Sequence, residues 1–108
     1  MNNDLVSIIV PVYNRAHTLE RLFSSLKAQT YRPLEIILVD NNSSDASLAV
    51  CREFAAVESA TDFSIVVAAE KTPGASVARN CGLRLAHADR VSFFDSDDEM
   101  SPDFIEAM

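Results

Sequence analysis

Four of the five residues in the segment 95–99 are acidic, and the segment directly follows an apolar run. Carboxylates held this close raise one another's pKa unless a cation lies between them. Mg²⁺ and Mn²⁺ bind one or two carboxylates together with substrate phosphates, and the spacing of Asp95 and Asp97 puts both on one side of an extended segment. The pattern therefore predicts either a divalent-metal site or a solvated acidic turn in which Asp98 or Ser101 caps the next helix.

A second carboxylate, Asp40, directly follows the apolar run 34–39. At the end of a strand it could accept a hydrogen bond from a ribose or a base, and the N3–H of uracil is a suitable donor. Alternatively, Asp40, Asn42 or Ser43 caps the helix that follows. The residue type alone leaves both interpretations open.

The segment 11–15 follows the first apolar run. Tyr13 is suited to stacking on a base, or to packing as an exposed aromatic residue at the end of a strand. Asn14 is either a ligand contact or an N-terminal cap, and Arg15 is either a ligand contact or a solvated charge. Pro11 marks the end of the predicted strand.

A third polar set lies in the helical run 75–86. Arg79 is within two turns of its start, so its side chain could reach a ligand and could also pair with Asp95 or Asp97; the two roles are compatible. Gly82 costs about 1 kcal/mol in the interior of a helix. That cost predicts a packing reason, namely close approach of this helix to the sheet.

The elements that must position these residues follow from the hydrophobic pattern. Apolar runs rich in β-branched residues predict strands at 6–10, 34–39, 63–69 and 90–94, and amphipathic spacing predicts helices at 17–29, 46–58 and 75–86. This alternation predicts an α/β fold, a Rossmann-like parallel sheet with helices on both faces. Ligands bind beyond the carboxyl ends of such strands, so the polar segments are expected to share one edge.

Composition narrows the class of protein. The chain has 108 residues, 48% of them hydrophobic, which suits one domain with a modest core. Its net charge of −7 argues against nucleic-acid binding, which needs a basic face. No apolar run reaches the roughly 20 residues that span a bilayer. His17 and His87 lack metal-ligand spacing. Cys51 and Cys81 also lack it, and these two cysteines are expected to be reduced thiols in the cytoplasm.

Taken in order, these segments resemble glycosyltransferase family 2, a group of inverting enzymes with a GT-A fold. The matching segments are 6–14, 35–45, 74–82 and 93–98. The resemblance implies that a nucleotide-diphosphate sugar, usually a UDP-sugar, is held by Pro11, Val12, Tyr13, Asn14, Asp40, Arg79, Asp95 and Ser96. It also implies that Asp97, with Asp95, binds Mn²⁺ or Mg²⁺, which bridges both phosphates and neutralises the leaving group.

The chain departs from the family pattern in two ways, and each leads to an expectation about its structure or activity. Ala46 stands where the family usually has Gly, so the loop after the second strand is expected to differ in shape. Family members are also longer, so residues 1–108 are expected to be the donor-binding N-terminal half of a GT-A domain, truncated at the C-terminus. The catalytic base is expected to lie outside the chain, so the chain alone should bind the donor without turning it over.

The acceptor implied by the resemblance is a saccharide or a lipid-linked saccharide, with the protein either free in the cytoplasm or peripheral at the inner membrane surface. The alternative interpretation is a non-catalytic nucleotide-binding or interaction module produced by truncation. Such a module could form a homo-oligomer through an exposed sheet edge or apolar patch.

Overall fold

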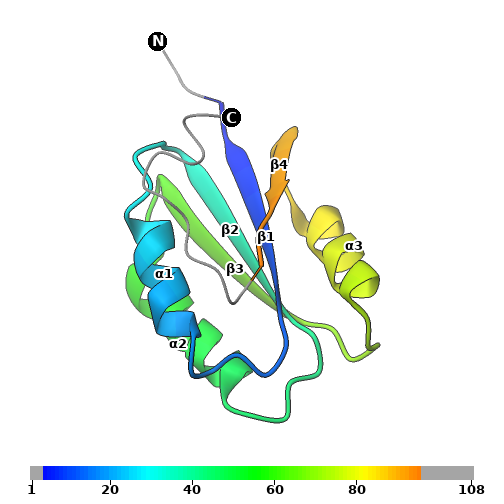
Figure 1. Ribbon diagram of the computed structural model, residues 1–108. Coiled ribbons are helices and arrows are strands. Elements are labelled where there is room, and N and C mark those ends of the chain that lie inside the picture. The colour runs from blue at the N-terminus through cyan, green and yellow to red at the C-terminus, as the bar shows by residue number, and fades with distance from the viewer. Residues whose placement is uncertain (1–3, 96–108) are drawn as a thin grey trace.

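The computed structural model describes residues 4–95 as alternating strands and helices (Figure 1). The elements are β1 (Val6–Val12), α1 (Leu19–Lys27), β2 (Leu34–Asp40), α2 (Ser47–Glu58), β3 (Phe63–Ala69), α3 (Ala75–Leu85) and β4 (Arg90–Phe93). All seven predicted elements are present. The helix expected from residue 17 begins at Leu19, because the carbonyl of Arg15 accepts the N–H groups of Thr18 and Leu19 in a preceding turn.

The four strands form one parallel sheet in the order β3-β2-β1-β4. In the register of the sheet, Val6 lies beside Leu34 on one side and Arg90 on the other, and Leu34 lies beside Phe63. The central strands β1 and β2 are buried almost throughout, whereas β3 and β4 at the edges are only partly buried. This contrast is what a sheet covered on both faces requires of apolar central strands.

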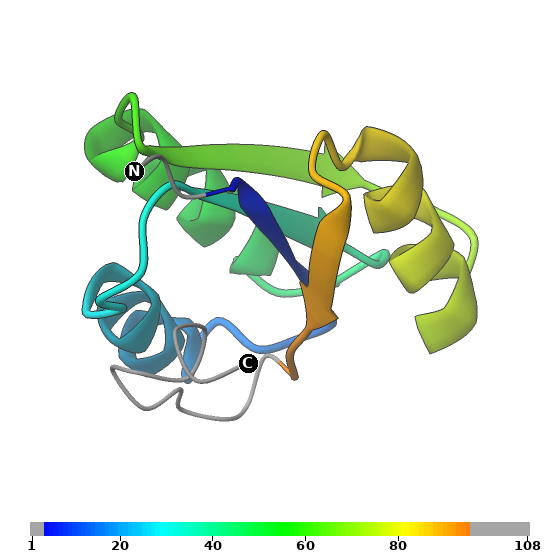
Figure 2. The same ribbon diagram turned by 90° about the horizontal axis from the view of Figure 1, so that it is seen from above.

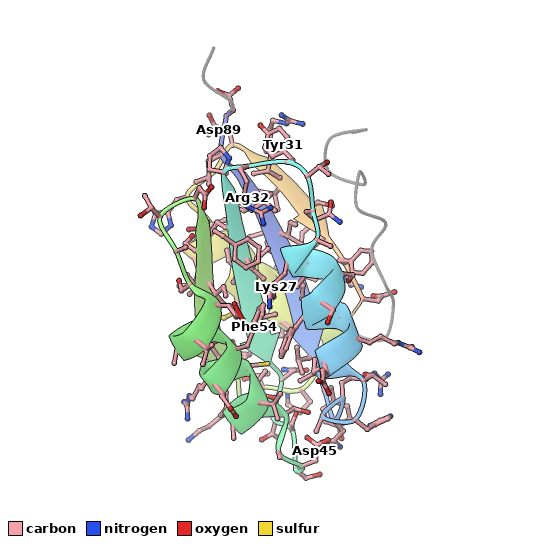
Figure 3. All side chains as sticks on the ribbon, turned by 90° about the vertical axis from the view of Figure 1, so that its left-hand side faces the viewer. Lys27, Tyr31, Arg32, Asp45, Phe54 and Asp89 are labelled. Carbon is pink, nitrogen blue, oxygen red and sulfur yellow. The ribbon has the colours of Figure 1, made fainter. Side chains whose placement is uncertain are left out.

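The helices cover both faces of the sheet, as predicted. Helices α1 and α2 lie on one side and α3 lies on the other (Figure 2). The α1–α2 side holds the larger core, where the rings of Phe23 and Phe54 stack at a centroid distance of 4.0 Å; Phe54 is seen between these helices in Figure 3. On the α3 side, Ile9, Ile37 and Ala78 form a smaller core.

Gly82 is a point of close approach between α3 and the sheet. A Cβ atom at this position would lie 2.4 Å from Cγ2 of Ile9, and Ile9 is fully buried in β1. Carbon atoms in contact normally lie about 3.5–4.0 Å apart. The expected packing reason for a glycine inside this helix is therefore confirmed.

A buried carboxylate lies at the amino end of the sheet. Glu35 in β2 accepts hydrogen bonds from the Ser7 hydroxyl at 2.7 Å and from the His87 backbone N–H at 2.8 Å, and its Oε2 lies 2.6 Å from His87 Nδ1. Burial is the largest influence on the Glu35 pKa and raises it, but these hydrogen bonds and the His87 ring together hold the pKa below its ordinary value of 4.5. His87, expected to be only a helix-end residue, thus fastens the segment before β4 to β2.

No helix within residues 4–95 is long and apolar enough to cross a bilayer.

Candidate functional site

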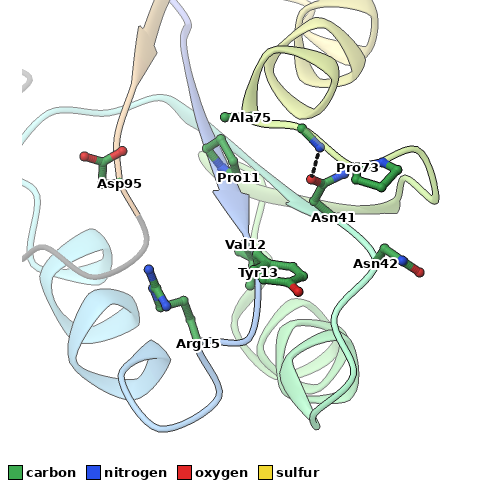
Figure 4. Close-up of a pocket in the computed structure, with 10 residues that line it drawn as sticks. Pro11, Val12, Tyr13, Arg15, Asn41, Asn42, Pro73, Ala75 and Asp95 are labelled. Atoms are coloured by element: carbon green, nitrogen blue, oxygen red, sulfur yellow. Dashed lines mark hydrogen bonds between the residues drawn. The ribbon is translucent and has the colours of Figure 1, made fainter.

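An open cleft of about 570 Å³ lies at the carboxyl ends of the strands (Figure 4). Polar loops from all four strands meet there, as expected for a parallel sheet. The cleft is lined by Pro11, Val12, Tyr13, Arg15, Asn41, Asn42, Pro73, Gly74, Ala75 and Asp95.

Four of the predicted ligand residues share this cleft. Pro11, Val12 and Tyr13 form its β1 side, and Asp95 follows β4 across the opening. The Tyr13 side chain is 57% exposed, so its ring is available to a ligand. Ser96, Asp97 and Asp98 lie outside the described residues, and within residues 4–95 no group of three His, Cys, Asp or Glu side chains is placed to hold a metal ion.

Asp40 is buried beside the cleft, and it is not one of the lining residues. Its Oδ2 accepts the Ser43 N–H at 3.2 Å, while Oδ1 is buried without a hydrogen-bond partner within the described part of the chain. Val12, its partner in the sheet register, and Asn41, which follows it in sequence, both line the cleft. Because Oδ1 has no described partner, Asp40 has an unused acceptor, which is costly to bury unless a donor reaches it. The charge of Asp40 also acts on Cys51: burial, together with this charge, raises the pKa of the Cys51 thiol to about 12.

Asn14 joins two loops and does not line the cleft. It adopts a positive φ of 50°, its backbone N–H donates to Ser43 Oγ at 2.9 Å, and its Oδ1 accepts the N–H groups of Ser44 and Asp45 at 2.8 and 3.3 Å. These bonds tie the β1–α1 loop to the β2–α2 loop. The structure gives Asn14 this bracing role in place of the helix cap that the sequence allowed.

Ser47, the first residue of α2, holds the backbone of Arg15. The Ser47 hydroxyl accepts the Arg15 N–H at 2.8 Å and donates to Asp45 Oδ1 at 2.5 Å. The hydrogen bond from Ser47 is the main reason that the pKa of Asp45 is lowered. Ala46, between them, has a φ of −80°, so this position does not need the glycine that the family usually has there.

Asn41 holds the opposite wall of the cleft. Its Nδ2 donates to the carbonyls of Glu70 and Thr72 at 3.2 and 2.8 Å, and its Oδ1 accepts the Gly74 N–H at 3.0 Å, the bond drawn in Figure 4. Gly74 has a φ of 129°, a conformation that favours glycine. Asn41 was not among the predicted ligand residues, since an Asn in a polar loop could equally be a cap; its place directly after Asp40 was the only signal in the sequence.

Among residues 4–95, the cation that lines the cleft is Arg15. Arg79, which was predicted to contact the ligand, is half-buried on α3 and is not among the lining residues. Arg15 was left open between a ligand contact and a solvated charge, and the structure puts it in the cleft lining. Charge type alone could not separate the two arginines, because their distances from the cleft depend on how the loop and helix are oriented.

The chain is similar to known proteins in both sequence and fold. Residues 7–108 match the family model described as Glycosyl transferase family 2. The chain is 38% identical over 106 residues to the glycosyltransferase GlyA of Streptococcus pneumoniae, covering 98% of this chain and 15% of that protein.

Two solved structures share the fold. One is S. aureus TarS 1–349 in complex with UDP, with a TM-score of 0.83 and 27% identity over 94% of this chain and 30% of that chain. The other is the mannosyltransferase PcManGT from Pyrobaculum calidifontis in complex with GDP-Man and Mn²⁺, with a TM-score of 0.79 and 30% identity over 87% of this chain and 28% of that one. The chain thus spans less than a third of each of these relatives.

Proposed function

Because the chain belongs to glycosyl transferase family 2 and has the GT-A fold, we propose that its cleft binds a nucleotide-diphosphate sugar and presents the sugar for transfer to an acceptor. The observation that carries the proposal is the meeting of Tyr13, Asp95 and the buried acceptor of Asp40 at one end of the sheet. In α/β folds of this kind, this end of the strands is where ligands bind.

The proposed binding site for the nucleobase uses Tyr13 and Asp40. The exposed Tyr13 ring offers a face on which a base can stack. The unpartnered Oδ1 of Asp40 is an acceptor, which matches the N3–H donor of uracil. TarS, one of the two structural relatives, was solved with UDP. These points support a UDP-sugar as the donor.

The proposed metal is Mn²⁺ or Mg²⁺, held by Asp95 and Asp97. Asp95 brings a carboxylate to the cleft, and hard cations favour carboxylate oxygens combined with phosphate oxygens. The relative PcManGT was solved with GDP-Man and Mn²⁺. When bound, the ion would neutralise charge on the departing diphosphate.

The proposed reaction inverts the anomeric centre, as in the family that the sequence resembles. Inversion needs a catalytic base on the acceptor side, whereas Asp95 in the cleft and Asp40 buried beside it are assigned to the donor. We propose a saccharide or lipid-linked saccharide as the acceptor, reached from the cytoplasmic side of the membrane.

Calorimetric titration with UDP tests the donor site. UDP should bind in Mn²⁺, and its affinity should fall at least about tenfold, or about 1.4 kcal/mol, in excess EDTA or after Asp97→Ala. Asp89→Ala, which removes the same charge from the exposed turn before β4, should leave the affinity unchanged. Equal affinity with and without metal would refute the metal role, and absence of UDP binding under all conditions would refute the donor site.

A further inference from the structure

Only two charged side chains line the described part of the cleft, and they have opposite signs. Arg15 reaches from the β1–α1 loop toward the side of the opening where Asp95 follows β4 (Figure 4). The chain as a whole carries a net charge of −7. An anionic nucleotide that enters this cleft therefore meets a protein of its own sign, and Arg15 is the described lining residue that can offset the repulsion.

The backbone of Arg15 is fixed before any ligand arrives. Its N–H donates to Ser47 Oγ at 2.8 Å, and its carbonyl accepts the N–H groups of Thr18 and Leu19 at 2.9 and 3.1 Å. Ser47 is itself held by Asp45. The base of the Arg15 side chain is thus anchored to the start of both α1 and α2, which lowers the entropy lost when the side chain binds a ligand.

The chemistry of the side chain indicates what it binds. A guanidinium group presents several N–H donors in one plane, and this geometry matches two oxygens of a phosphate. Tyr13, two residues earlier in the same loop, is the surface proposed for the base. One short loop therefore supplies both the surface proposed for the nucleobase and a cation suited to phosphate.

We propose that Arg15 binds the diphosphate of the nucleotide directly, adding to the charge supplied by the metal. This inference rests on the proposed function, since it assumes that the cleft holds a nucleotide-diphosphate sugar. The competing role is indirect, in which Arg15 only orients Asp95 and acts on the nucleotide through the metal. The two roles differ in whether the effect of Arg15 survives removal of the metal.

The test is an NMR titration of the protein with UDP and with uridine, each in Mg²⁺ and in EDTA. Arg15→Gln should weaken UDP binding at least about tenfold in Mg²⁺ and to a similar degree in EDTA, with uridine affinity unchanged. Arg15→Lys should recover part of the loss, because an ammonium keeps the charge but not the planar fork. Arg21→Gln, the same charge change on the exposed surface of α1, is the matched control and should not alter UDP affinity.

Three results would overturn the inference. UDP affinity could be unchanged in Arg15→Gln, the losses for UDP and uridine could be equal, or the loss could vanish in EDTA; the last result would assign Arg15 to orienting Asp95. A wild-type protein that binds neither UDP nor uridine would instead refute the proposed function, and the inference with it.

Discussion

Replacing Gly82 with alanine tests how tightly α3 packs on the sheet. The added Cβ would lie 2.4 Å from Cγ2, 3.1 Å from Cγ1 and 3.3 Å from Cβ of Ile9. Ile9 is fully buried in a central strand, so it has little room to move. Overpacking of this kind costs about 1–3 kcal/mol, and the shortest contact favours the upper part of that range. The greater helix propensity of alanine returns about 1 kcal/mol, which leaves an expected net loss of about 1–2 kcal/mol.

Urea unfolding followed by circular dichroism measures this loss. Ala56→Gly, at an exposed position of α2, calibrates the alanine–glycine difference without a contact. In an Ile9→Ala background the two shortest contacts, to Cγ2 and Cγ1, are absent and only the 3.3 Å contact to Cβ remains. Gly82→Ala should then stabilise the protein by up to about 1 kcal/mol, giving a coupling energy of about 2–3 kcal/mol. A Gly82→Ala variant as stable as the wild type, or additivity of the two changes, would refute the close-approach argument.

Three further predictions concern the interior and the cleft walls. Glu35→Gln should lower the free energy of unfolding by about 1–3 kcal/mol at pH 7. Because the pKa of Glu35 is lowered in the folded state, the stabilisation that this carboxylate gives is present above pH 4.5 and is lost as the pH falls through the folded pKa. Urea unfolding as a function of pH should therefore show less acid sensitivity in the variant than in the wild type. Asn41→Asp should weaken UDP binding at least about tenfold in a titration, since a carboxylate cannot donate to the carbonyls of Glu70 and Thr72; unchanged affinity would show that the wall does not depend on these bonds. Cys51 should react with iodoacetamide at pH 8 only after unfolding, because its pKa is raised to about 12; labelling of the native protein at Cys51 would contradict its burial.

The order and type of the elements were predictable because each has its own hydrophobic period. The end of β1 was not predictable: Pro11 was expected to end the strand, yet β1 continues to Val12. The carbonyl of Ile9 accepts the Phe94 N–H and that of Val12 accepts the Asn41 N–H. Pro11 therefore directs its nitrogen toward the β4 side, beyond the last β1–β4 residue pair, so the pairing of β1 with β2 does not need an N–H at this position.

The members of the cleft were only partly predictable. Pro11, Val12 and Tyr13 come directly at the end of a strand, so topology alone directs them to the site. The roles of Asn14 and Asn41 depend on which loop lies opposite each side chain, and the sequence alone does not show which loops lie close together in the fold. The same limit applies to Glu35, which reads as one polar residue in an apolar strand until Ser7 and His87 are brought beside it.

The pairing of β4 with β1 has a consequence for how the protein folds. Strand β2 is held by two ladders of seven residue pairs each, whereas the described β4 is held by a single ladder of four pairs with β1, between the two ends of the described chain. Contacts between distant parts of a chain form late in folding, and weakly held edge elements open first in native-state hydrogen exchange. We therefore expect Asp95 to join the cleft in the last folding step and to leave it in the first local unfolding event. Donor binding would then help to keep β4 paired with β1.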